Sequence, residues 1–521
     1  MISRRLFLAG GGALAAAPAF AQGDPTVATS LGPVRGVREG GLSVFRGIRY
    51  GIAERFRAPR PPARSREPVA ATTFGPSAPQ RGDRYRPAGE DCLFLNVWTP
   101  EVAAGSPASS RAPRARLPVM VYFHGGAYST GSVADPLNDG RFLANDGDCV
   151  TVTVNHRLNA LGYLYLARLD PRFPDSGNAG QLDLILALQW IRDNIAGFGG
   201  DPRRILVFGQ SGGGAKIATL MGMPAAKGLF HRAITMSGQQ VTASGPLNAT
   251  ARARAYLEAL KLGSAGELLA LPAERLVEGL AATDPILGGG VYMGPVLDMK
   301  WLTRHPFWPD ANPQSNAIPM MLGNTRDETR AFIDPDGEKV RTLNWDNIAE
   351  RMAPELRIDL HPEWIVSQYR SRFPGWTPER VFYAATTAGR SWPGQVIEAD
   401  ARASAGAPTW VYQVDFQSPT QPRRGAPHTM DIALAFGTLD AEGSYAGTGP
   451  QARALSAAMM KAFTAFARKG DPNGGGVPAW PAYRLPERST MVWDGRSRAV
   501  SDPRRWEREL FARAPYIQPG T

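Results

Sequence analysis

The sequence predicts an α/β fold with a large, mostly parallel central sheet and helices on both faces. From about Pro118 onward, short apolar runs rich in β-branched residues alternate with amphipathic helical runs. The chain is 43% hydrophobic and 20% charged, as expected of a globular protein rather than a fibrous one or a membrane bundle. Its 57 glycines and 45 prolines indicate many turns and long structured loops.

Each element of this sheet is predicted from its local pattern. Short apolar runs typical of buried strands lie at residues 119–123, 150–154, 205–208, 233–236 and 410–416. Two helices are predicted from apolar residues at helical spacing, which places them on one stripe. The first stripe is Leu184, Leu188, Ile191 and Ile195, and the second is Leu455, Met459, Phe463 and Phe466.

The N-terminal residues 1–21 are predicted to be a twin-arginine signal peptide. Arg4 and Arg5 precede an apolar stretch, which is followed by the small-residue cleavage site Ala19-Phe20-Ala21. The stretch is too short and too rich in Ala and Gly to span about 30 Å of hydrocarbon. We therefore expect export to the periplasm or the medium, with cleavage after Ala21.

The remaining residues 22–521 are predicted to form a single domain, because they contain no internal repeat and no long Pro/Gly/Ser linker. Residues 103–117 are rich in Ala, Ser, Pro and Arg without periodicity, so we expect a mobile surface insertion there. No later window approaches 18 uninterrupted apolar residues, which argues against membrane insertion of the mature chain.

Charge and cysteine content exclude further classes. The formal net charge is +11, but the basic residues are spread along the chain and lack interleaved aromatics, which argues against nucleic-acid binding. Cys92 and Cys149 are the only cysteines, too few for a disulfide framework or a cysteine-rich zinc site. We expect two buried free thiols, with a Cys92–Cys149 bridge as the alternative.

A nucleophile is predicted at Ser211. The pattern G-x-S-x-G is met by Gly209-Gln210-Ser211-Gly212-Gly213, which follows the strand predicted at residues 205–208 and precedes a helical run from about Gly214. This is the setting of the nucleophile elbow of α/β-hydrolases, in which a tight turn exposes the serine and requires small residues on either side. In a glycine-rich chain the motif alone is weak evidence, so the predicted strand and helix carry the argument.

A serine hydroxyl needs an adjacent base, which is usually histidine. In α/β-hydrolases the chain order is nucleophile, acid, histidine, so of the six histidines only His361 and His428 lie far enough along. His428 lies in a loop after the strand predicted at residues 410–416, whereas His361 has the pattern of a helix start. We therefore predict His428 as the base.

The acid and the oxyanion hole are expected at two other strand ends. The apolar run before Asn324 leads into a polar turn with two carboxylates, Asp327 and Glu328, and the residues themselves do not decide between them. The strand at residues 119–123 leads into His124-Gly125-Gly126-Ala127-Tyr128, whose small residues let backbone N–H groups approach a substrate oxygen. The N–H of Gly212 adds a further donor, and losing one such donor typically costs about 10²- to 10³-fold in rate.

With these motifs in order, the chain resembles the type-B carboxylesterases over nearly all of its mature length. Further matching segments are Phe45 to Tyr50, Glu90 to Trp98, Val154 to Leu158, Asn178 to Asp183, Phe198 to Pro202, Asn324 to Glu328 and Gly470 to Asn473. The resemblance implies one large α/β-hydrolase domain with long loops over an active-site gorge, and no cofactor or metal. It also implies that Glu328 is the acid, that Gly126, Ala127 and Gly212 supply the oxyanion donors, and that Gly125 lets the loop bend.

Three positions depart from the family pattern. Gln210 stands where Glu is usual, which removes a negative charge beside the site and argues against a cationic substrate. Gly212 stands where Ala is usual, which we expect to loosen the elbow. Ala78 stands where the family commonly has the cysteine that bridges to the position of Cys92, so that loop disulfide cannot form.

The expected activity is hydrolysis of small to medium carboxylic esters through an acyl-enzyme. One alternative is acyl transfer to an alcohol or amine, or cleavage of amides or lactones, by the same three residues. The other is a non-catalytic binding module resembling neuroligins, which the three filled positions argue against.

Overall fold

The computed structural model describes residues 23–100 and 116–520. The predicted signal peptide and most of the predicted insertion lie outside these ranges. Of the insertion only Arg116 and Leu117 are described, and Leu117 is already the buried first residue of strand β7 (Leu117–Phe123). The insertion therefore ends earlier than predicted, because its last apolar residue belongs to the sheet.

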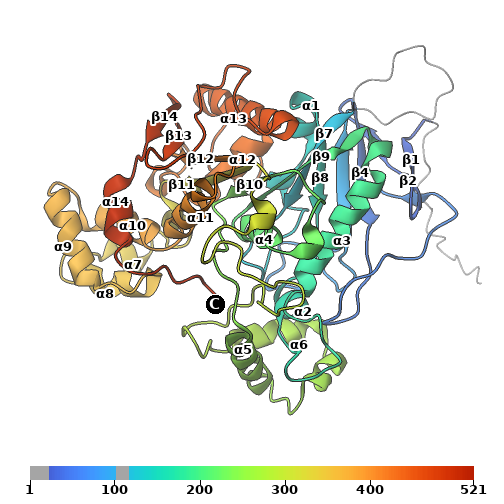
Figure 1. Ribbon diagram of the computed structural model, residues 1–521, viewed down its shortest axis with the longest axis horizontal. Helices are drawn as coiled ribbons and strands as arrows, with labels where there is room; N and C mark the ends of the chain where they lie inside the picture. Colours follow the sequence, from blue (N-terminus) through green and yellow to red (C-terminus); the bar gives the residue numbers. More distant parts are fainter. Residues whose placement is uncertain (1–22, 101–115, 521) are drawn as a thin grey trace, which may run out of the picture.

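The centre of the described part of the chain is an eleven-stranded sheet (Figure 1). Its six inner pairings are parallel, and the pairings at both ends are antiparallel. In spatial order the strands are β14 (Arg498–Ser501), β13 (Ser489–Trp493), β12 (Thr409–Val414), β11 (Met320–Thr325), β10 (Arg232–Met236), β9 (Gly200–Gln210), β7, β8 (Val150–Val154), β6 (Phe94–Thr99), β4 (Leu42–Arg49) and β3 (Val37–Glu39). All five predicted strands are present: the strand at residues 150–154 has the predicted ends, and the other four differ by one to five residues at an end.

The sheet is covered on both faces, as predicted. Alternate residues of β7 point to opposite cores: Val119 and Val121 belong to one cluster, and Met120 and Tyr122 belong to the other. The first core is closed by α3 (Ala179–Asn194), α4 (Gly212–Leu220) and α11 (Trp392–Ser404). The second is closed by α1 (Arg141–Asp146), α12 (Met430–Phe436) and α13 (Pro450–Lys469). Both predicted helical stripes are buried in these two cores.

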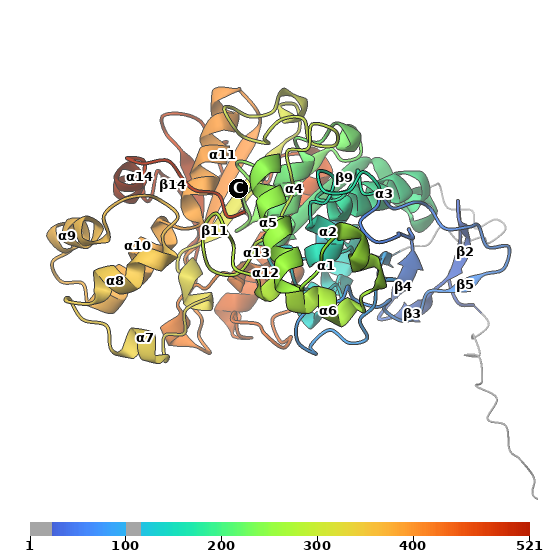
Figure 2. The ribbon, with the colours of Figure 1, turned by 90° about the horizontal axis from the view of Figure 1, so that it is seen from below.

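Smaller units flank the sheet, and Figures 1 and 2 place them at its two ends and along one face. Beyond the β11–β14 end lie α7 (Glu338–Arg341), α8 (Ile348–Met352), α9 (Pro362–Arg372), α10 (Pro378–Ala388) and α14 (Arg505–Phe511), which share a separate core. At the other end a small sheet joins β1 (Thr26–Thr29), β2 (Gly32–Arg35) and β5 (Val69–Ala70). Helices α2 (Asn159–Tyr163), α5 (Pro246–Ala259) and α6 (Ala273–Glu278) enclose a third core.

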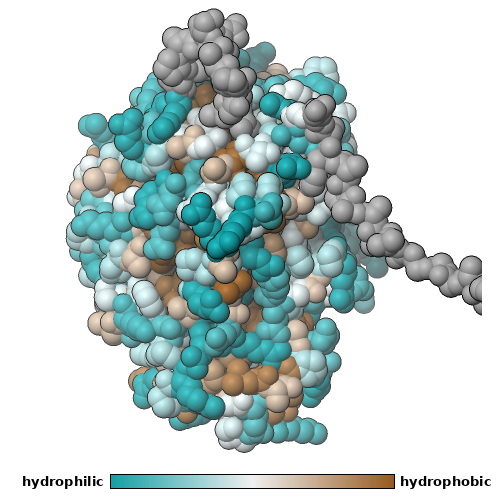
Figure 3. Space-filling view, turned by 90° about the vertical axis from the view of Figure 1, so that its right-hand side faces the viewer, coloured by the Kyte–Doolittle hydropathy of each residue, from teal (hydrophilic) through white to brown (hydrophobic). Residues whose placement is uncertain are grey.

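Both cysteines are free and buried, as predicted. Ala78, which stands where a cysteine is common in the family that the sequence resembles, is also buried. On the face drawn in Figure 3, hydrophobic residues reach the surface in small groups among hydrophilic ones. Among the described helices, none is both long enough and apolar enough to cross a membrane.

Candidate active site

Ser211 lies in the tight turn between β9 and α4. Its backbone has φ 55° and ψ −126°, a strained conformation for a residue other than glycine. A Cβ on Gly209 would lie 2.7 Å from the carbonyl carbon of Gly213, and a Cβ on Gly213 would overlap the carbonyl oxygen of Phe123. Both glycines are therefore required by the turn, as the motif predicts, and α4 begins at Gly212, two residues earlier than expected.

The elbow presents Ser211 to the surface while its neighbours stay buried. Ser211 is partly exposed, whereas residues 205–210 and 212–223 are buried. The Ser211 N–H donates to the carbonyl of Met236 (2.7 Å), and its carbonyl accepts from the N–H of Ala215 (3.0 Å). The serine backbone is thus held by β10 and α4, and its side chain is left free for chemistry.

His428 reaches the site from the loop between β12 and α12, as predicted, and its side chain is buried. Its Nδ1–H donates to the Glu328 carboxylate, which leaves Nε2 as the acceptor. Nε2 is buried and has no hydrogen-bond partner among the described residues. By contrast, His361 caps the start of α9, as its sequence pattern predicts.

Glu328 is fully buried at the start of the short helix η7 (Glu328–Ala331), just after β11. Its Oε1 accepts from the Ser237 hydroxyl (2.6 Å), the Thr325 N–H (2.8 Å) and the Asn324 amide (3.2 Å). Burial alone would raise the pKa of Glu328, but the adjacent His428 and these donors outweigh it and hold the pKa below its usual value. The carboxylate that faces the imidazole is therefore charged at neutral pH.

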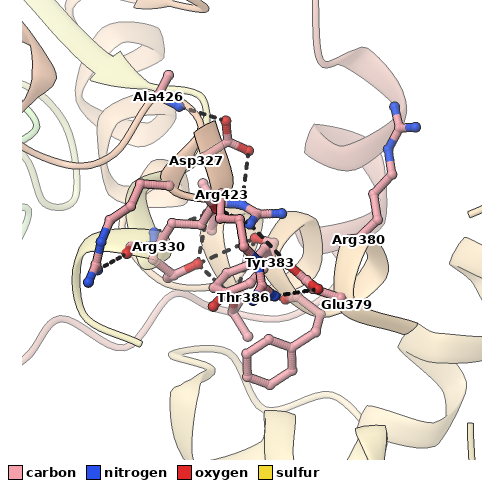
Figure 4. Close-up of polar contacts among 12 residues, drawn as sticks. Asp327, Arg330, Glu379, Arg380, Tyr383, Thr386, Arg423 and Ala426 are labelled. Carbon is pink, nitrogen blue, oxygen red and sulfur yellow. Dashed lines mark hydrogen bonds and ion pairs between the residues drawn. The ribbon is translucent and has the colours of Figure 1, made fainter. Parts of the chain in front are cut away.

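Asp327 contacts Ala426, in the loop that carries His428 (Figure 4). Its Oδ2 accepts from the Ala426 N–H (3.0 Å), its own N–H donates to the Ala426 carbonyl (3.0 Å), and the Arg330 guanidinium lies 3.9 Å away. The residues themselves do not decide whether Asp327 or Glu328 faces the histidine. The structure pairs Glu328 with the imidazole and makes Asp327 a brace for the histidine loop.

The loop after β7 runs beside the nucleophile and has an unusual backbone. Gly126, Ala127 and Tyr128 have positive φ values of 95°, 51° and 61°. The N–H groups of Gly126, Ala127 and Gly212 donate to no protein acceptor in the described ranges, and Ala127 is exposed. Three backbone donors near one serine are what an oxyanion hole requires.

Gly212 also has a packing role that its sequence pattern does not predict. It is buried, and a Cβ at this position would lie 2.8 Å from the backbone nitrogen of Ala127. The glycine allows the loop to approach the start of α4 more closely than a side chain would permit.

Three further residues near the site were not predicted. Ser237 directly follows β10, and its hydroxyl contacts Glu328; a polar residue at a strand end was the available signal. Phe332 is 49% exposed, with its ring centre 4.7 Å from that of His428. Asp431 is buried and accepts from the Tyr412 hydroxyl (2.9 Å). Nothing in the local pattern distinguishes Phe332 or Asp431 from core residues.

The residues predicted for the site thus lie in the turns and loops that follow β7, β9, β11 and β12 of one sheet. A serine, an imidazole oriented by a charged carboxylate, and free backbone donors are together suited to nucleophilic attack on a carbonyl carbon. Within the described ranges no group of three or more His, Cys, Asp or Glu side chains is placed to hold a metal ion.

The chain is similar to several characterised proteins over most of its length. The family described as the carboxylesterase family matches residues 23–503. A para-nitrobenzyl esterase of Bacillus subtilis is 33% identical over 507 residues, covering 93% of this chain and 97% of the relative. A phenmedipham hydrolase of Pseudarthrobacter oxydans is 33% identical over 510 residues, covering 90% and 94%.

Solved structures agree with this similarity. A carboxylesterase of Geobacillus stearothermophilus superposes with a TM-score of 0.82 at 32% identity, covering 93% of this chain and 99% of the other. An esterase of Clostridium hathewayi, described as able to hydrolyse aliphatic aromatic polyesters, superposes with a TM-score of 0.76 at 30% identity, covering 94% and 98%.

Proposed function

The chain belongs to the carboxylesterase family and hydrolyses carboxylic esters, and from this premise we propose that Ser211 is its nucleophile, His428 its general base and Glu328 the acid that orients the base. The observation that supports this assignment best is the buried pairing of His428 Nδ1 with Glu328, which leaves Nε2 without a protein partner. The relatives are named as esterases and hydrolases, so acyl transfer and a non-catalytic role are not favoured.

In the proposed reaction His428 Nε2 takes the proton of the Ser211 hydroxyl as its oxygen attacks the ester carbonyl carbon. The carbonyl π electrons move to the oxygen, and the N–H groups of Gly126, Ala127 and Gly212 stabilise that oxyanion. When the oxyanion collapses, the bond to the alcohol oxygen breaks and His428 returns its proton to the leaving alcohol. Water then repeats the cycle on the acyl-enzyme, which releases the acid and restores Ser211.

For the substrate we propose an ester with an aromatic group on its acyl or alcohol side. Phe332 is half exposed and lies against the imidazole of His428, while the Arg390 guanidinium lies 5.2 Å from the ring centre of Phe332. An exposed aromatic ring beside the base offers a surface on which a flat ring can stack. Relatives named for para-nitrobenzyl esters and aliphatic aromatic polyesters lend this choice support.

The assignment is tested with the variants Ser211→Ala and His428→Ala and with a fluorophosphonate probe. We expect both variants to lose nearly all hydrolysis of para-nitrophenyl esters, and the probe to label the wild type at Ser211 only. Full activity in Ser211→Ala would exclude the proposed nucleophile. A panel of benzoate, benzyl and purely aliphatic esters then tests the preference for aromatic groups.

We also propose that the protein is exported through the twin-arginine route and cleaved after Ala21. This rests on Arg4, Arg5 and the small-residue site at Ala19 to Ala21. N-terminal sequencing of the exported protein should begin at Gln22, and replacing both arginines by lysine should retain the precursor in the cell. Export that persists after this replacement would contradict the proposal.

A further inference from the structure

Lys216 is a fully buried lysine in α4, five residues after the nucleophile, and the proposed reaction gives it no role. Its exposed fraction is 0%, and it has no carboxylate partner among the described residues. Its ammonium donates to the carbonyl of His124 (3.0 Å) and lies 5.5 Å from the ring centre of Tyr128. It therefore contacts both ends of the loop 124–128, which carries the proposed oxyanion donors.

A buried lysine of this kind lowers the stability of the folded state. Burying a charge without an opposite charge is strongly unfavourable, and here burial lowers the pKa of Lys216 to about 7. The ionisable neighbours of Lys216 do not offset the free-energy cost of burying its ammonium. The buried rings of His124 and His156 stack on each other with centres 4.6 Å apart, and burial, together with Lys216, keeps the pKa of both far below the usual value. Burial of this amine destabilises the folded protein, which indicates that Lys216 has a role in the site.

The contacts of Lys216 bear on the direction of the peptide planes in the loop. In a trans peptide the C=O and the next residue's N–H point in opposite directions. The His124 carbonyl is bound by Lys216, and the Gly125 carbonyl is bound by the His124 Nδ1–H (2.9 Å). The Gly126 carbonyl accepts from the N–H groups of Ser129 (2.8 Å) and Thr130 (2.9 Å).

Three successive carbonyls are therefore held by donors within the protein. Because each carbonyl points toward its donor, the N–H in the same peptide points away from that donor. These N–H groups belong to Gly125, Gly126 and Ala127. Two of these N–H groups are proposed oxyanion donors, and the Ala127 nitrogen lies beside Gly212, the third. The first carbonyl is the only one of the three that depends on a side chain from α4.

We propose that Lys216 is a positioning residue that holds the oxyanion loop by its hydrogen bond to the His124 carbonyl. In this role it acts through the loop and not on the substrate itself. Without it the first peptide of the loop loses its donor and is free to rotate. That rotation moves Gly125 away from the His124 ring that binds its carbonyl, so the N–H groups of Gly126 and Ala127 turn away from the oxyanion. The inference rests on the proposed function, since it assumes that the N–H groups of Gly126 and Ala127 stabilise that oxyanion.

The test compares Lys216→Met, which keeps the apolar stem and removes the donor, with Lys227→Met, an exposed lysine on the turn after α4. Active sites are counted by the end point of fluorophosphonate labelling. Because losing a whole oxyanion donor costs about 10²- to 10³-fold, we expect kcat of Lys216→Met to fall about 10- to 100-fold. KM should change less than about twofold, and Lys227→Met should match the wild type.

Two further readouts separate positioning from a structural role. A trifluoromethyl ketone forms an oxyanion adduct with the serine, so its inhibition constant should rise in Lys216→Met by the same factor by which kcat falls. The thermal midpoint should change little, because the substitution removes the cost of burying the amine and also the hydrogen bond to the His124 carbonyl, two effects of opposite sign. Lys216→Gln, which retains a donor, should recover part of kcat.

The inference is overturned if Lys216→Met keeps full kcat and full affinity for the ketone. It is equally overturned if stability falls while kcat per labelled site is unchanged, or if Lys216→Gln is no faster than Lys216→Met. Ser211→Ala, assayed in parallel, reports on the proposed function separately: activity in that variant would refute the nucleophile, whatever the lysine variants do.

Discussion

The side-chain amide of Gln210 donates a 2.8 Å hydrogen bond to the backbone carbonyl of His428. The residue before the nucleophile thus holds the loop that carries the base, across 218 positions of sequence. The sequence marked Gln210 only as a departure that removes a charge. Its amide also makes a contact that a carboxylate cannot make at neutral pH, because a carboxylate only accepts hydrogen bonds.

Gln210→Glu should therefore slow hydrolysis of neutral esters at pH 8. One hydrogen bond contributes about 1 kcal/mol, so kcat/KM should fall about fivefold. The difference should narrow toward pH 5, where the new carboxyl group binds a proton and regains a donor. Profiles of kcat/KM against pH for both proteins check this, and parallel profiles would contradict it. For a cationic ester, kcat/KM should fall less than for a neutral ester, because the new carboxylate attracts the cation.

The two neighbouring carboxylates should respond very differently to substitution. Glu328→Gln keeps the shape but removes the charge that orients the imidazole, and kcat should fall by a factor on the order of 10⁴. Asp327→Ala removes a brace of the histidine loop and should lower the thermal midpoint by a few degrees, with kcat reduced about tenfold or less. If the larger loss of kcat followed Asp327→Ala, the assignment of the acid would be wrong.

Gly212→Ala tests how closely the oxyanion loop approaches the elbow. The added methyl group would lie 2.8 Å from the Ala127 nitrogen, so the loop must shift, and we expect kcat to fall about tenfold or more. Gly245→Ala is the matched control, because a Cβ there meets nothing within 4 Å and the backbone φ is −64°. Equal activity of the two variants would contradict the prediction, because it would show that the loop can move without loss of activity.

Asp431→Asn should stabilise the protein above neutral pH. Burial, followed by repulsion from Glu328, raises the pKa of Asp431 to about 7. Between about pH 4 and 7 the folded protein holds a proton that the unfolded chain has released, so this group's contribution to stability falls as the pH rises and is least favourable above pH 7.

Thermal midpoints at pH 5 and pH 8 measure the effect. Asp431→Asn should gain more over the wild type at pH 8 than at pH 5, because the neutral amide escapes the cost of a buried carboxylate. The exposed Asp346→Asn serves as the control and should show no such difference. A gain independent of pH would exclude a buried charge as its cause.

Patterns in the sequence located much of the fold and the centre of the site. The β7 and β9 strands and the α3 and α13 stripes follow from periodicity, which the backbone geometry of each element imposes locally. The elbow at Ser211 follows from glycine at positions where a Cβ would collide. His428 followed from chain order and from its place in a loop after a strand.

The remaining features depended on tertiary structure because they join residues far apart in the chain. Asp327 and Glu328 have the same local signal, and only the packing of the histidine loop against β11 decides which carboxylate meets the imidazole. The contact of Lys216 with the His124 carbonyl spans 92 positions and leaves no periodic trace. Local sequence determined which residues can react, because conformational preferences act over only a few residues. Packing decided which side chains orient the reactive residues, because neighbours from other strands set the direction in which each side chain points.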